Sequence, residues 1–123
     1  MAAINHVVKG TYLAKIEEYA AETYAEGLSE LKDKLAAMTE LYKQAIALVG
    51  EVNDTEYKDF HARRLVEMAG HIIMGYLLLG DATRNDSFTR SANVYINYAE
   101  AEVAKNFKFV SESNLDKMKM YKA

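Results

Sequence analysis

The stretch RRLVEMAGHIIMGYLLLGDA, from Arg63 to Ala82, is apolar at almost every angle around a helix. Four residues interrupt the apolar run between Leu65 and Leu79: Glu67, Gly70, His71 and Gly75. A run this short, which carries a carboxylate and an imidazole, falls below the roughly 20 apolar residues that cross a bilayer. The stretch therefore predicts a buried helix of a soluble protein, with no membrane span. Because so little of its surface is polar, a compact bundle or another protein surface must cover it on more than one side.

The composition favours a single domain built from long helices. The chain has 123 residues, 50% of them hydrophobic, which is enough to bury a core without covalent cross-links. It contains no proline and only 6 glycines, so long uninterrupted helices are permitted. It also contains no cysteine, which excludes disulfides, thiolate metal sites and thiol nucleophiles.

The charge and the N-terminal residues narrow the range of partners and compartments. The formal net charge of -3 argues against nucleic acid or anionic lipid as the main partner, because both require a basic face. At the N-terminus no basic region precedes an apolar run, so we expect no secretion signal. A cytoplasmic location is compatible with these features and with the missing cysteines, and we expect it.

Four helices account for nearly all of the chain, and we expect an all-α, four-helix up-and-down bundle. Their expected ranges are 11–25, 28–49, 55–80 and 87–109. In the second helix the apolar residues alternate between spacings of three and four, as in the seam of packed helices: Leu28, Leu31, Leu35, Met38, Tyr42, Ala45 and Val49. The fourth helix has a similar set: Phe88, Ala92, Tyr95, Ala99, Val103 and Phe107.

Glycines and short polar residues mark the expected ends of these helices. Gly50 is expected to end the second helix in a left-handed conformation, and Gly80 is expected to end the third. The third helix has three candidate N-caps, of which the first has Glu56 three residues on, in the form of a capping box: Asn53, Asp54 and Thr55. The fourth helix also has three: Asn85, Asp86 and Ser87.

One charged group stands among the apolar residues of the third helix. Glu67 and His71 lie one turn apart on the same side, and Arg63 and Arg64 lie one turn before Glu67. The group could act as a general base or as a pair of metal ligands with a shifted pKa. It could also be an intrahelical ion pair or hydrogen-bond network that satisfies a partly buried carboxylate, because an unpaired buried charge is costly. The structural interpretation is the one we favour.

The sequence contains no motif for a metal centre. A di-iron centre in a helical bundle needs Glu-x-x-His on two helices, and no such spacing occurs here. A His-Glu-x-x-His zinc motif is also missing. A noncovalent haem between a methionine and a histidine on facing helices stays open, although methionines such as Met68 and Met74 are more typical of core packing. Three histidines are available: His6, His61 and His71.

A phosphotransfer bundle is a second class of function to consider. Its reactive histidine is exposed, with a cation three residues later and a small residue after that cation. His61 has Arg64 at this spacing but a leucine next, and His71 has Met74 there, so neither carries the full pattern. Dinucleotide and phosphate loops are also missing, since no two glycines fall at the Gly-x-Gly spacing.

Two segments of the second half carry a resemblance to a known family. They are LVEMAGHIIMGYLLLGDA, residues 65–82, and SFTRSANVYINYAEAEVAKNFKFV, residues 87–110. The likeness rests on these residues of the first segment: Glu67, Ala69, Gly70, Ile72, Gly75, Leu77, Asp81 and Ala82. In the second segment it rests on these: Ser91, Ala92, Tyr95, Glu100, Val103 and Phe109. Together the segments resemble the C-terminal helical extension domain of bacterial acyl-CoA dehydrogenases.

The resemblance implies a parent enzyme that removes two hydrogens from a fatty acyl-CoA thioester with FAD as acceptor. Such enzymes bind the flavin and hold the catalytic carboxylate in an N-terminal helical domain, a strand domain and a first C-terminal bundle, whose glycine-pair signatures are missing here. We therefore assign no catalytic, cofactor-binding or metal residue to this chain. We expect a non-catalytic accessory domain that braces the subunit or its oligomer interface. The alternative is a free-standing interaction bundle of the phosphotransfer or adaptor type.

At about 100° per residue, the third helix divides into two faces. One stripe is assigned to the core: Leu65, Met68, Ala69, Ile72, Tyr76 and Leu79. The other face mixes apolar and paired polar groups, as protein interfaces do, and is the candidate interface: Phe60, Arg63, Glu67, His71, Met74 and Leu78. We expect this face to dock onto the catalytic core of the same enzyme or onto a homodimer partner.

Overall fold

A computed structural model describes residues 10–114, 116–117 and 120 of the chain. Within this part the chain is all-α: four helices pack against one another, and there is no strand. Residues 1–9, which include His6 and on which the expectation of no secretion signal depends, lie outside the described residues. The elements are α2 (Thr11–Ala20), the 3-10 turn η1 (Glu26–Leu28), α3 (Ser29–Glu51), α4 (Thr55–Arg84), the 3-10 turn η2 (Asp86–Phe88) and α5 (Thr89–Glu112).

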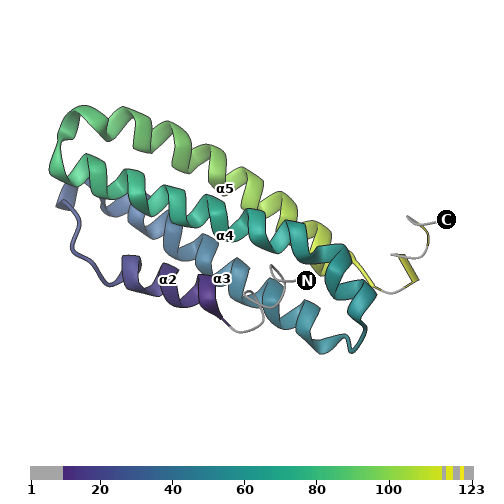
Figure 1. Cartoon of the computed structure of the whole chain (residues 1–123). Helices are drawn as coiled ribbons and strands as arrows, with labels where there is room; N and C mark the ends of the chain where they lie inside the picture. The colour runs from purple at the N-terminus through teal and green to yellow at the C-terminus, as the bar shows by residue number, and fades with distance from the viewer. Residues whose placement is uncertain (1–9, 115, 118–119, 121–123) are drawn as a thin grey trace.

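Successive helices run in opposite directions along one long axis, which confirms the expected all-α bundle (Figure 1). The connections between α3 and α4 and between α4 and α5 are short, as antiparallel neighbours require. The three long helices α3, α4 and α5 all pack against one another, and α2 packs mainly against α4. The site described below lies between α4 and α5.

The core consists of the apolar stripes that the sequence predicts. Every residue of the seam expected in the second helix is buried, six of them in α3 and Leu28 in η1, and the most exposed, Leu31, is only 7% exposed. All six residues assigned to the core stripe of α4 are buried. These two predictions are confirmed. Small and medium side chains of α5 complete the core, and four of them are 0% exposed: Ala92, Ile96, Ala99 and Val103.

Gly75 lets α3 and α5 pack closely on α4. A Cβ atom at this position would lie 2.5 Å from Leu35 Cδ2 and 3.6 Å from Ile96 Cγ1. Both neighbours are 0% exposed, so neither can move into solvent to make room. Since protein interiors are packed as densely as organic crystals, the missing side chain of Gly75 is part of the fit between three helices.

The first helix ends at Ala20, not at residue 25 as expected. The Tyr19 carbonyl accepts hydrogen bonds from the Glu22 backbone N–H at 3.2 Å and from the Tyr24 hydroxyl at 2.7 Å. In a continuing helix this carbonyl would accept the N–H of residue 23. The last carbonyls of a helix lack N–H partners within it, and the Tyr24 hydroxyl donates a hydrogen bond to one of those at the C-terminus of α2.

The segment between α2 and α3 packs against the C-terminal third of α4. The ring of Tyr24 packs on that of Tyr76, with the centroids 6.1 Å apart. The Ala25 backbone N–H donates to Thr83 Oγ1 at 3.2 Å. Such contacts between residues far apart in sequence are invisible to a search for helical periodicity, which explains why the end of the first helix was placed too late.

The other three helices run past their expected C-terminal ends. Gly50 and Gly80 lie inside α3 and α4, and neither has a positive φ, so both glycine stops were wrong. α3 ends where Val52 turns to an extended conformation, with φ -85° and ψ 113°. In α4 and α5, buried side chains still reach the core beyond the expected ends, Ala82 at 4% and Val110 at 2% exposure.

The structure decides between the alternative N-caps. Asp54 caps α4, because its side chain accepts the backbone N–H of Tyr57 at 2.8 Å. Asn85 accepts the N–H of Ser87 at 3.0 Å and caps η2, so α5 begins two residues later than expected. Phe88, expected as an apolar core position, lies in η2 and is 46% exposed.

α4 is longer than the apolar run suggested, so the argument from length against a membrane span does not hold. The helix has 30 residues and contains an 18-residue window with a mean hydropathy of 1.3, enough by length and composition to cross a bilayer. The core helix of a soluble protein passes the same test, and 44% of the window is buried. What identifies α4 as a core helix is its packing against α2, α3 and α5.

Two glycines of α4 provide a matched test of this packing. We expect Gly70→Ala to raise the free energy of unfolding by roughly 1 kcal/mol, because alanine is the better helix former and nothing lies near its new Cβ atom. Gly75→Ala should be less stable than Gly70→Ala by about 1–3 kcal/mol, since it overpacks the contact with Leu35. Urea unfolding of both variants measures the difference. Equal stabilisation by both substitutions would show that α3 can move away from α4 at no cost.

Candidate interaction surface

α4 and α5 run side by side (Figure 1), and a hollow that both helices line marks an outer groove between them. Four of the six candidate interface residues of α4 line this hollow or contact α5. Phe60, Arg63 and Glu67 line a hollow that α5 also lines. His71 contacts two tyrosines of α5, and Met74 and Leu78 follow on the same side of α4, three and seven residues later. We call this surface the α4–α5 face. It comprises the six predicted residues and, from α5, Val94, Tyr95 and Tyr98.

His71 connects the two helices at the centre of the α4–α5 face. Its Nδ1 lies 2.9 Å from the Tyr95 hydroxyl, and which of the two donates the proton depends on the tautomer of the imidazole. The edge of its ring meets Tyr98, with the centroids 5.8 Å apart. Burial, and then the neighbouring Tyr98, raise the pKa of the Tyr95 hydroxyl, which keeps it protonated at neutral pH. The contact holds α4 and α5 in register and leaves Tyr98 facing outward at 54% exposure.

Glu67 pairs with Arg63 and not with His71. Arg63 Nε lies 3.1 Å from Glu67 Oε1, one turn away along the helix, and the Glu67 side chain is 44% exposed. A solvent-exposed pair of this kind contributes about 0.3–0.5 kcal/mol. Because the carboxylate and the imidazole bind different partners, the geometry favours the structural interpretation over a general base or a pair of metal ligands. Among the described residues, no group of three or more His, Asp or Glu side chains could hold a metal ion.

A cationic and aromatic hollow lies at one end of the α4–α5 face. It has a volume of about 450 Å³ and seven lining residues: Phe60, Arg63, Arg64, Glu67, Lys105, Asn106 and Phe109. The Arg64 guanidinium lies over the Phe109 ring at 4.0 Å and the Phe60 ring at 5.0 Å, and Nη1 donates to the Phe60 carbonyl at 2.8 Å. Arg64 is thus held by stacking in the groove, where it covers apolar surface with its planar group.

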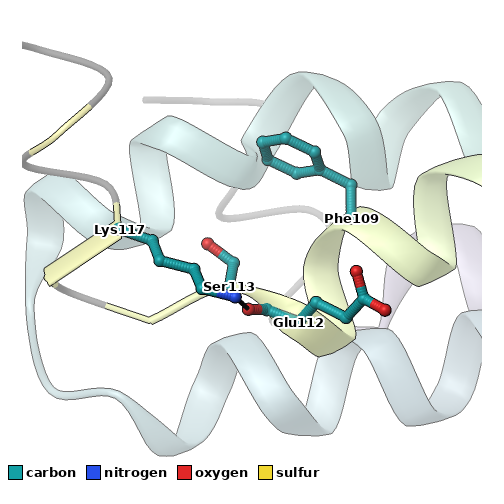
Figure 2. A pocket seen from close by; sticks show the side chains of 4 residues that line it. All are labelled: Phe109, Glu112, Ser113 and Lys117. Atoms are coloured by element: carbon teal, nitrogen blue, oxygen red, sulfur yellow. Dashed lines mark hydrogen bonds between the residues drawn. The ribbon is translucent and has the colours of Figure 1, made fainter.

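A smaller hollow beyond it is closed by the C-terminal turn. Figure 2 shows the Lys117 side chain reaching past Ser113, where its Nζ donates to the Glu112 carbonyl at 2.6 Å. Phe109 forms the opposite wall. The volume is about 80 Å³, which is well below the roughly 300 Å³ of a small-molecule site. We therefore assign no ligand to this hollow.

His61 is a titratable group whose burial was not predicted from the sequence. It is 0% exposed, and neither ring nitrogen has a hydrogen-bond partner. Aromatic rings surround it edge-on, with the centroids of Tyr57, Phe60 and Phe109 at 4.7, 4.9 and 5.9 Å. Burial, and then the nearby positive charge of Arg64, lower its pKa to about 4. A phosphotransfer histidine must be exposed, so His61 does not fit that class.

The sequence does carry a signal for the burial of His61. It lies four residues before Leu65, the first residue of the core stripe of α4, and four residues after the buried Tyr57. Extending the stripe backwards by one turn would have placed the imidazole in the core. Helical periodicity was applied only to apolar residues, so the place of this histidine in the core was not predicted.

The geometry defines a helical bundle with a partly apolar outer face, and the comparisons give its family. The model of the family described as acyl-CoA dehydrogenase C terminal matches residues 8–118. The chain belongs to this family. It is also similar to the crystal structure of an acyl-CoA dehydrogenase family protein from Porphyromonas gingivalis, with 43% identity and a TM-score of 0.87, over 93% of this chain and 99% of that one. No protein with a curated description matches the chain.

His61 predicts how the stability of the domain depends on pH. The ordinary pKa of the imidazole is 6.5 and its value in the folded domain is about 4, so between these values the unfolded chain binds a proton that the folded domain does not. We expect the free energy of unfolding to decrease as the pH falls from 6.5 to 4, by up to roughly 3 kcal/mol. No further loss from this group is expected below pH 4.

The variant His61→Phe keeps an aromatic ring in the core and removes the titrating group. Denaturant unfolding of both proteins at several pH values between 7.5 and 4 isolates the contribution of His61, because the carboxylates titrate in both. The wild type should lose more stability than the variant over this range. Equal losses in the two proteins would show that His61 is protonated at little cost in the folded domain.

Proposed function

We propose that this chain is a non-catalytic C-terminal helical domain of an acyl-CoA dehydrogenase, an enzyme that oxidises fatty acyl-CoA thioesters with FAD. The observation that carries the proposal is the family match over residues 8–118. The likeness to the Porphyromonas gingivalis protein supports it over nearly the whole bundle. In this proposal the flavin and the catalytic carboxylate belong to other parts of the parent enzyme, and the chain acts in the cytoplasm.

The role proposed for the domain is to brace the subunit or its oligomer interface through the α4–α5 face. Three large apolar residues are exposed on this face, Met74 at 45%, Val94 at 65% and Tyr98 at 54%. Adjacent exposed apolar residues with polar groups at their rim are typical of protein interaction sites. Glu67 paired with Arg63 and Glu102 paired with Lys105 supply that rim. The partner is the catalytic core of the same enzyme or a second copy of the chain.

The purified chain should be colourless and inactive. With added FAD, a fatty acyl-CoA and an artificial electron acceptor, we expect neither a bound flavin spectrum nor reduction of the acceptor, because the catalytic groups are assigned elsewhere. Absorbance between 350 and 500 nm and a dye-reduction assay measure the two properties. Yellow protein, or turnover above a blank without protein, would mean that the bundle belongs to the catalytic part of the enzyme.

Charged substitutions on the two faces of α4 should have different effects. Ile72 is 0% exposed, so Ile72→Glu places an unpaired carboxylate in the core and should unfold the domain. Leu78 is half-buried at the edge of the α4–α5 face, and Leu78→Glu should leave the domain folded while it weakens association. Circular dichroism melts measure folding in both variants. Light scattering and binding to the flavin-loaded catalytic region of an acyl-CoA dehydrogenase from the same organism measure association.

Two results would contradict the bracing role. One is a wild-type chain that neither self-associates nor binds the catalytic region. The other is a Leu78→Glu variant that melts as low as Ile72→Glu, which would show that Leu78 belongs to the core and that the α4–α5 face ends before it.

A further inference from the structure

α5 carries a ridge of four residues spaced four apart, of which the first three are exposed and the fourth is half-buried. Residues at this spacing form one of the ridges by which helices pack, and in α5 they are Arg90, Val94, Tyr98 and Glu102. Val94 and Tyr98 are among the exposed large hydrophobic residues, and the side chain of Glu102 is 26% exposed. The first three of these residues, with Ser91 and Tyr95, line a shallow hollow of about 520 Å³. The ridge is therefore accessible to a second helix.

The charges of this ridge are complementary to those of an identical ridge that runs in the opposite direction. Read along α5, it runs from a cation through two apolar residues to a carboxylate. Arg90 has no ion-pair partner among the residues that the structure describes. At the other end, the Tyr98 hydroxyl donates to Glu102 Oε1 at 3.2 Å and Lys105 Nζ lies 2.9 Å from Oε2. One end thus presents an unpaired positive charge, and the other presents an oriented carboxylate.

We propose that this ridge packs against the same ridge of a second copy of the chain, in an antiparallel dimer with two-fold symmetry. In an alignment centred between Val94 and Tyr98, Val94 of one copy lies beside Tyr98 of the other, and each Arg90 lies beside the opposite Glu102. The two charged ends are about 18 Å apart along the helix, from a rise of about 1.5 Å per residue. Ridges at this spacing pack side by side when two helices cross at about −50°.

This inference rests on the proposed function and names the partner of the α4–α5 face. The exposed surface around the ridge extends onto α4. The ring of Tyr98 contacts His71 of α4. Met74, three residues further along α4, is 45% exposed. The contact between copies therefore has an apolar centre with charged groups at both ends. A two-fold interface requires a self-complementary surface, and this order of charges provides one.

A charge exchange tests both the partner and the direction of the helices. Arg90→Glu places two carboxylates side by side at both ends of the dimer, and Glu102→Arg places two cations there. Each single variant should dimerise about tenfold or more weakly, as expected when two exposed ion pairs become repulsive. The double variant Arg90→Glu, Glu102→Arg restores opposite charges and should recover most of the affinity. Sedimentation equilibrium of the 123-residue chain over a range of concentrations gives the dissociation constants.

An apolar variant and a matched control locate the interface. Val94→Glu should abolish the dimer, because its carboxylate would lie against Tyr98 of the second copy. Ala47→Glu adds the same charge at an exposed position of α3, away from the ridge, and should dimerise like the wild type. Both positions are exposed, so both variants should melt close to the wild-type temperature.

Three outcomes would overturn the inference. A wild-type chain that stays monomeric at high concentration excludes the dimer, and if it still binds the catalytic region of the dehydrogenase, the proposed bracing function survives without it. A dimer that persists in Val94→Glu uses another face. Failure of the double charge variant to recover the affinity lost in the single variants excludes the antiparallel alignment.

Discussion

The rest of the structure depends on the need to cover α4. This helix has so little polar surface that one neighbour cannot shield it, and α2, α3 and α5 all pack on it. The fit requires close approach as well as apolar contact, since the missing side chain of Gly75 leaves room for Leu35 of α3. Burial of this one helix therefore sets the number of helices around it and the groove in which the α4–α5 face lies, while the short connections set their antiparallel order.

The helices could be predicted from the sequence, and so could the starts of α2 at Thr11 and α4 at Thr55, but none of the C-terminal ends could. The seam of α3 and the core stripe of α4 follow helical periodicity residue by residue, because burial of an apolar side chain is the main force that selects a helix face. The end of α2 depends instead on the hydroxyl of Tyr24, a single hydrogen bond that leaves no trace in the apolar pattern. Gly50 and Gly80 each cost about 1 kcal/mol inside a helix. Beyond Gly80 the burial of Ala82 in the core outweighs this penalty.

The candidate site could also be predicted only in part. The six residues of α4 share one helix face, so their placement follows from periodicity alone. The α5 side of the surface was missed because Tyr95 was counted among the core positions and Val94 and Tyr98 were not considered. Which side of α5 stays exposed depends on how α4 and α3 flank it, and that is a tertiary property. His61 shows the opposite case, a polar residue at a core position that the sequence pattern already contained.

The brevity of α2 has a consequence for how the domain assembles. Of its ten residues only Ile16 is fully buried, whereas α3, α4 and α5 each bury several side chains and form successive hairpins with short connections. Contacts local in sequence form first, at little cost in chain entropy. The three long helices can therefore collapse as one cooperative unit, with α2 docking last and detaching first. Its thermal openings would expose Tyr76, whose ring lies 6.5 Å from that of Tyr19, long before the remaining core meets water.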